Sequence, residues 1–149
     1  MKKKIAWIVT WFMLVFFSII NTCNAFAQVE IEKTPAKIKK IQMIYGEFEK
    51  PVEYVPLSFI AISETDSTML IGNTNYQIAK IITTDSVTTY LAKDIDNKEF
   101  VYDSNKNTLT QRNIAKDRRT GELQKGKFEV WFVYTLIIKN ENEFELGGL

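Results

Sequence analysis

The sequence predicts an all-β fold: a single antiparallel domain of about eight or nine short strands. Residues typical of turns recur about every 8 to 12 positions, as in antiparallel β proteins. The segments between them alternate apolar and polar residues and are rich in β-branched and aromatic side chains. Short hairpin links dominate between Tyr54 and Arg112. They favour an up-and-down barrel of lipocalin-like layout over a sandwich, which needs a long return.

The first 27 residues have the pattern of a secretory signal peptide. Three lysines at positions 2–4 precede the apolar run from Ile5 to Ile20, and the segment closes on Ala25-Phe26-Ala27. Ala25 and Ala27 occupy the two positions where signal peptidase needs small side chains, so we expect cleavage before Gln28. Export to the periplasm or the exterior follows from this reading.

Two alternatives place the protein on a membrane instead. The apolar run could remain as an uncleaved anchor, although at about 1.5 Å per residue it is shorter than the ~30 Å hydrocarbon core. Cys23 could carry a lipid, although Thr22 stands where a lipoprotein signal has Gly, Ala or Ser. A membrane contact is expected only through this signal segment.

Composition excludes several classes of function. A chain of 149 residues without its first 27 is one domain of ordinary size, and loss of three of 19 basic residues, against 18 acidic ones, leaves a net charge of about −2. This charge does not indicate a nucleic-acid partner. The single cysteine precedes the cleavage site, so the mature chain forms no disulfide. The absence of histidine excludes Ser-His-Asp and Cys-His catalysis and histidine-ligated metals.

The segment after the signal is predicted as a flexible leader over residues 28–36, followed by the β domain over residues 37–149. The leader is polar, contains Pro35 and has no sustained period. Residues 37–49 fit two patterns: Ile38, Ile41 and Ile44 have helical spacing, whereas Ile41, Met43 and Tyr45 alternate. A strand is favoured because the neighbouring segments are strand-like.

Strands are then predicted in close succession from residue 54 to residue 112. Pro51 and Pro56 indicate an edge position or an irregular start for the first of them. The predicted strands and the turns between them follow from the alternation: strands at 54–62, 68–71, 76–84, 87–93, 99–103 and 108–112, with turns at 63–67, 72–75, 94–98 and 104–107.

The C-terminal third has two contrasting parts. Residues 113–127 carry charges of both signs and two glycines, which predicts a long exposed loop that could contact a partner. Residues 128–139 are apolar on both faces, which predicts a central strand or one whose outer face is covered by another element. A turn at 140–142, a short last strand at 143–146 and a frayed end at 147–149 complete the prediction.

No cofactor, metal site or catalytic residue is predicted. Residues 103–107 and 94–99 resemble the start of a calcium loop, but Thr108 replaces its glycine, Ile114 replaces its last glutamate, and Lys98 stands at a ligand position of the second segment. Hairpin turns rich in Asp and Asn explain both segments. Carboxylates are numerous enough for a glycosidase pair, but the sequence does not identify the two. No glycine-rich phosphate loop or nucleophile elbow occurs.

The expected function is therefore an exported, non-enzymatic binding protein. A small apolar ligand would sit inside the barrel, lined by Tyr76, Tyr90, Tyr102, Trp131 and Tyr134, although aromatic side chains at strand spacing are more often plain core. A protein partner would bind outside, through the loop from Lys116 to Lys127. The alternatives are a carboxylate-dependent hydrolase of envelope polysaccharide and a structural component of the cell envelope.

Overall fold

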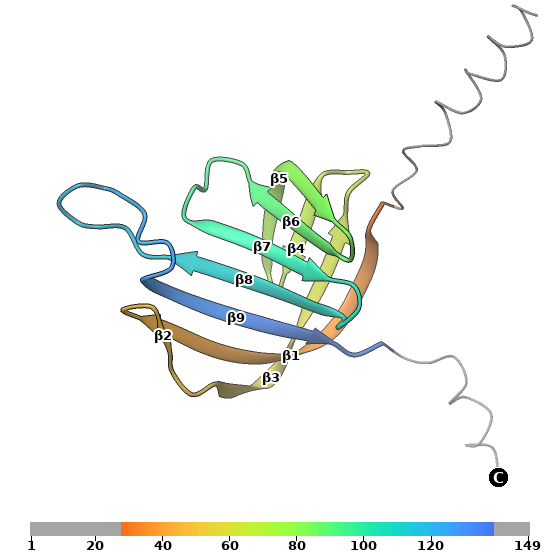
Figure 1. The fold of residues 1–149 in the computed structure, drawn as a ribbon. Helices are drawn as coiled ribbons and strands as arrows, with labels where there is room; N and C mark the ends of the chain where they lie inside the picture. The colour runs from red at the N-terminus through yellow and green to blue at the C-terminus, as the bar shows by residue number, and fades with distance from the viewer. Residues whose placement is uncertain (1–27, 139–149) are drawn as a thin grey trace, which may run out of the picture.

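A computed structural model describes residues 28–138, which form one antiparallel sheet closed into a barrel (Figure 1). Within these residues the chain contains nine strands and no helix. The strands are β1 (Glu30–Ile44), β2 (Glu47–Phe48), β3 (Val52–Ser63), β4 (Thr68–Ile71), β5 (Thr74–Thr84), β6 (Val87–Ala92), β7 (Lys98–Asp103), β8 (Thr108–Ile114) and β9 (Phe128–Leu136).

The barrel closes because β1 pairs with a different strand along each half of its length. Residues 30–40 of β1 pair with β3, and residues 36–44 pair with β9. From β3 to β9 each strand pairs with the next one in the chain, which is the up-and-down order predicted from the short links. Eight strands therefore form the barrel wall, and β2 is an additional short strand on the free part of β1.

The prediction of a flexible leader over residues 28–36 is wrong, because β1 begins at Glu30. Ile31 and Ala36 pair with Ile62 and Ser58 of β3, and Ala36 is fully buried. Pro35 is tolerated at the end of the β1–β9 ladder. Its carbonyl points toward β9 and accepts a hydrogen bond from the N–H of Ile137, beyond the last strand pair. Because the N–H and carbonyl of one strand residue point to the same side, the missing N–H of Pro35 removes no hydrogen bond from the ladder.

Residues 37–49 form strands, as favoured, and contain a hairpin turn. Tyr45 and Gly46 have φ values of +53° and +84°, the conformation of a two-residue turn that matches strand twist. The chain then returns as β2, where Phe48 pairs with Met43. The three longest strands all exceed their predicted lengths, with 15 residues in β1, 12 in β3 and 11 in β5. Their length lets one strand pair with different neighbours at its two ends.

The barrel interior is filled by side chains from every wall strand. The largest fully buried ones pack there with smaller residues into one continuous core: Ile60, Ile62, Met69, Tyr90, Phe100 and Leu109. Because side chains alternate along a strand, this core fixes which residues of each strand face inward and which face outward.

The outer face of β9 is covered in part by another element, one of the two arrangements that its apolar sequence indicated. Trp131 lies on this outer face, in register with Ile41 of β1 and Arg112 of β8. The ring of Phe48 in β2 meets it edge to face, with 5.0 Å between the ring centroids.

The signal peptide and the short last strand lie outside residues 28–138, so both stay predictions. Among residues 28–138, no helix is long and apolar enough to cross a membrane.

Candidate functional site

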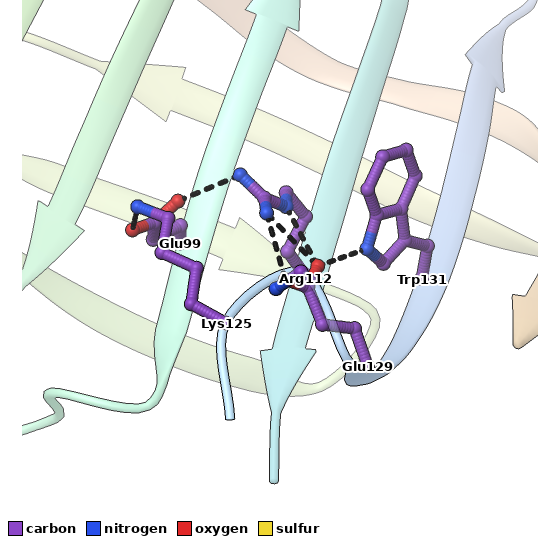
Figure 2. A network of polar contacts seen from close by, with 6 residues as sticks. Glu99, Arg112, Lys125, Glu129 and Trp131 are labelled. Carbon is purple, nitrogen blue, oxygen red and sulfur yellow. Dashed lines mark hydrogen bonds and ion pairs between the residues drawn. The ribbon is translucent and has the colours of Figure 1, made fainter. Parts of the chain in front are cut away.

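The most organised polar cluster of the described chain lies outside the barrel, around Arg112 (Figure 2). Glu99 of β7, Arg112 of β8 and Trp131 of β9 occupy one row across three paired strands. Arg112 Nη1 donates to Glu99 Oε2 at 2.9 Å, and its Nε and Nη2 donate to both oxygens of Glu129 at 2.9 to 3.1 Å. The fork geometry of guanidinium allows this bidentate contact, which an ammonium cannot make.

The network is largely removed from water although it lies on the outer face. The Glu129 side chain has no exposed surface, and Arg112 and Glu99 are only 19% and 16% exposed. The guanidinium carbon of Arg112 lies 5.0 Å from the centre of the Trp131 ring. Trp131 also donates its indole N–H to Glu129. Every atom that could carry a charge here therefore has a partner, which is the condition for tolerating buried charges.

The surroundings of Glu129 keep its carboxyl group ionised. Burial alone would raise its pKa, but hydrogen bonds from the Gly126 N–H, Trp131 and Arg112, together with the charge of Arg112, outweigh burial and lower the pKa. A carboxylate of this kind can position other groups. It cannot serve as a general acid, which needs a raised pKa.

The network also fixes the segment from residue 116 to residue 127, here called the basic loop. Lys125 Nζ contacts Glu99 Oε1 at 2.6 Å, and the Gly126 N–H donates to Glu129 Oε1 at 2.6 Å. Both contacts lie at the C-terminal end of the loop and tie it to the barrel wall. The loop predicted over residues 113–127 is thus largely exposed but anchored, and it begins later than predicted, because Asn113 and the buried Ile114 belong to β8.

The tip of the basic loop is held by its own hydrogen bonds. Asp117 Oδ1 accepts the N–H groups of Arg119 and Thr120 at 2.8 and 2.9 Å, and these contacts lower the Asp117 pKa. Lys116 and Leu123 form an isolated bridge across the loop. Arg118 and Arg119 stand exposed at the tip.

The β1–β2 turn lies against the end of the basic loop. The Gly46 N–H donates to the Lys127 carbonyl at 3.2 Å, and Tyr45 packs edge-on against Phe128 with 4.9 Å between ring centroids. Tyr45 itself is 84% exposed. An aromatic side chain and two arginines are thus presented at one end of the barrel, here called the loop end.

The structure separates the five residues predicted to line a ligand. Tyr76, Tyr90, Tyr102 and Tyr134 lie buried inside the barrel, whereas Trp131 lies on the opposite side of the wall, beside Arg112. Tyr90 donates to Glu64 Oε1 at 2.8 Å, and Tyr76 packs against Phe100. Burial, and less strongly the proximity of Tyr76, raises the pKa of Tyr134 to about 12. These tyrosines belong to the packed core.

The two segments that resemble calcium loops are occupied by other contacts. Asp103 accepts the N–H groups of Asn105 and Lys106 and forms an ion pair with the Lys106 side chain at 3.1 Å. In the other segment Asp96 pairs with Lys116 at 2.6 Å, and Glu99 belongs to the Arg112 network. Among residues 28–138 no group of three or more candidate ligands is arranged to hold a metal ion.

The two carboxylates that face each other most closely in this network do not form a hydrolytic pair. Glu99 and Glu129 flank the guanidinium of Arg112 rather than a cleft, and the side-chain oxygens of both are taken by hydrogen bonds. A glycosidase needs one protonated carboxyl beside open space for the sugar. Glu99 and Glu129 therefore do not supply the carboxylate pair that the hydrolase alternative requires.

Sequence reasoning did not identify the Arg112 network, although one signal for it was present. Glu129 is the only charged residue in the apolar run from Phe128 to Ile138. A lone charge in such a run needs a partner. Finding Arg112 as that partner requires the register of β8 on β9, which the sequence does not supply. No family model, curated protein or solved structure matches this chain.

Proposed function

We propose that this chain is an exported, non-enzymatic binding protein that engages a protein partner through the loop end. The contact surface consists of the basic loop and the exposed Tyr45. The observation that carries the proposal is the anchoring of the loop by Lys125 and Gly126 to two carboxylates of the barrel wall. The interior of the barrel, which is filled by buried side chains, gives less support to an enclosed ligand.

A loop that is ordered before binding loses less conformational entropy when a partner docks. The internal turn at Asp117 and the contacts to Glu99 and Glu129 supply this order without any partner. The loop thereby presents Arg118 and Arg119 in a defined position. Arginine and tyrosine are the residue types that contribute most to protein interfaces.

The charge of the basic loop indicates an acidic partner surface. The loop contains five basic residues against Asp117 and Glu122, a net charge of about +3 on a chain that is otherwise slightly acidic. Lys116 and Lys125 are engaged in ion pairs, so the exposed Arg118, Arg119 and Lys127 supply the charge available to a partner. Binding should accordingly weaken as ionic strength rises.

Site-specific photo-crosslinking in intact cells tests the proposal. A photoreactive residue at position 119 should give one discrete adduct, and the same residue at position 80 of β5, an exposed lysine away from the loop end, should give none. Arg118→Glu with Tyr45→Ser should abolish the adduct from position 119. Equal labelling from both positions, or an adduct that survives these changes, would refute the proposed surface.

The location of the adduct also tests export and the alternative of a structural envelope component. A partner in the cytoplasm would contradict export. Adducts formed with several chains of this same protein, from positions around the whole barrel, would instead indicate a structural assembly. The binding proposal requires a single partner that contacts the loop end.

A further inference from the structure

The inner face of the loop end is apolar and only partly covered. Here β1, β3 and β9 extend past the packed core, and several side chains on the inward-facing positions are exposed: Ile44 at 39%, Tyr54 at 42% and Val52 at 55%. A hollow of about 300 Å³ lies at this end, lined by Ile44, Phe128 and Val130 among others. Exposed apolar surface continuous with a core is typical of binding sites.

Two lysines occupy inward-facing strand positions near this hollow, although neither lines it directly. Lys40 pairs with Phe132 on the inward side of β1 and β9, and the Lys98 Nζ lies 5.5 Å from the centre of the buried Tyr76 ring. Among the described residues, neither lysine has a carboxylate within ion-pair distance. The inward-facing strand positions at this end contain no Asp or Glu. Lys98 also lines a neighbouring hollow with Asp94, Asp96 and Glu99, of which Asp96 and Glu99 form ion pairs with other basic side chains.

We propose that the loop end binds a free, single-chain anionic amphiphile inside the barrel mouth. Its apolar chain would lie along the inner faces of β1, β3 and β9, and its acidic head group would pair with Lys40 and Lys98. This inference does not depend on the proposed protein partner, because it concerns the inner face of the wall rather than the outer loop.

The spacing of the two lysines suits one shared head group. Lys98 lies in the row of Asn113, Val130 and Gln42, and Lys40 lies in the next row. Three strand spacings of about 4.8 Å separate β7 from β1, roughly 14 Å along the wall. The curvature of the barrel shortens this distance across the mouth. Polar Gln42 and Asn113 between them can donate further hydrogen bonds.

Calorimetric titration with dodecanoate, below the concentration at which it forms micelles, tests this inference. The titrated sample is the protein as purified from the cells that produce it. Saturable binding of one molecule per chain is expected, and dodecyltrimethylammonium, with the same tail and opposite charge, should bind at least tenfold more weakly. Lys40→Gln with Lys98→Gln should weaken dodecanoate binding at least tenfold. The matched control is Lys33→Gln with Lys37→Gln, which removes two exposed charges of β1 away from the mouth and should leave the affinity unchanged.

Further variants separate this site from its alternatives. Val130→Glu places a carboxylate on the inner wall and should reduce the preference for dodecanoate over dodecyltrimethylammonium, and a melting curve for each variant verifies folding. Arg118→Glu, which weakens the proposed partner contact, should not change dodecanoate affinity. Equal affinity in the wild type and the Lys40, Lys98 variant would overturn the inference. Binding only to vesicles of anionic phospholipid, with none to free dodecanoate, would also overturn it.

Discussion

Arg112 connects the charged side chains on the outer face of the barrel. It neutralises Glu129, whose side chain has no exposed surface, and Glu99, which in turn holds Lys125. Removing one member of a buried ion pair costs more than the pair itself contributes, because the remaining charge is left without compensation. The loop end therefore needs Arg112 to compensate these carboxylates, whether or not the ion pairs add to the free energy of unfolding.

Arg112→Met should lower the free energy of unfolding by about 3–5 kcal/mol, since it leaves the Glu129 carboxylate buried and unpaired. Chemical denaturation monitored by circular dichroism measures the change. Lys106→Met is the matched control, because it removes an ion pair whose lysine is 75% exposed. That control should cost less than about 1 kcal/mol. Equal effects of the two substitutions would show that the network is not buried as described.

Glu129 should also make stability depend on pH in the acid range. Its pKa in the folded chain lies below the ordinary value of 4.5. Between these two values the unfolded chain binds more protons, so stability rises with pH there. The stabilisation that ionised Glu129 provides is fully present above about pH 4.5, and it is lost as the pH falls through the lowered pKa of the folded chain. Urea unfolding at a series of pH values should show Glu129→Gln with a shallower acid slope than wild type. Identical slopes would contradict this assignment.

Tyr134 should have the opposite effect at alkaline pH. Its pKa rises from 10.0 to about 12 in the folded chain. Between these values the unfolded tyrosine loses its proton while the folded one keeps it, so stability falls with rising pH. The stabilisation that the protonated Tyr134 hydroxyl provides is complete below pH 10 and is lost as the pH rises toward about 12. Tyr134→Phe should reduce the alkaline slope of the unfolding free energy, and a slope unchanged from wild type would contradict the burial of this hydroxyl.

Among the elements, the basic loop shows what sequence patterns can and cannot predict. Its charge and glycine content correctly predicted exposure. Its anchoring depends on Lys125 and Glu99, which are 26 positions apart and meet only because β7, β8 and β9 are neighbours. Contacts of this kind follow from strand register, which local periodicity does not determine.

Lys125→Ala should loosen the basic loop without unfolding the barrel. Lys125 is 58% exposed, so its ion pair contributes less than about 1 kcal/mol to global stability. The loop nevertheless loses its ion pair to Glu99 on the barrel wall. Amide hydrogen exchange should become faster at residues 122–126 and stay unchanged in β6 and β7. Unchanged exchange in the loop would mean that Gly126 and the internal turn suffice to hold it.

The strands themselves were largely predictable, whereas their irregularities were not. Alternation located β4, β6, β7 and β8 within one or two residues. In β5, strict alternation would put Ile82 on the same face as Tyr76 and Ile78, but a register shift between Ile78 and Lys80 brings Ile81 into register with buried Tyr90 instead. A bulge adds one residue to a strand and exchanges its two faces beyond that point. Nothing in the local composition marks its position.

At the scale of the whole molecule, barrel closure was the favoured prediction, and the reason given for it was sound. Short links require neighbouring strands to pair in chain order, which the structure confirms from β3 to β9. Closure also needs β1, which reaches its required length only by including the supposed leader from Glu30 to Ala36. The polar composition of that segment concealed its role, because its outward-facing charges are the solvated side of a strand.

The central claim is that β1 joins β9, since this pairing brings Lys40 and Lys98 to one mouth and the β1–β2 turn to the basic loop. Cross-strand nuclear Overhauser effects in the isotope-labelled protein test it most directly. Closure predicts contacts between the backbone protons of Ile38 and Tyr134 and of Gln42 and Val130, with slow amide exchange along both strands. Their absence, with fast exchange along one edge of both β1 and β9, would show an open sheet and would contradict the loop end as described.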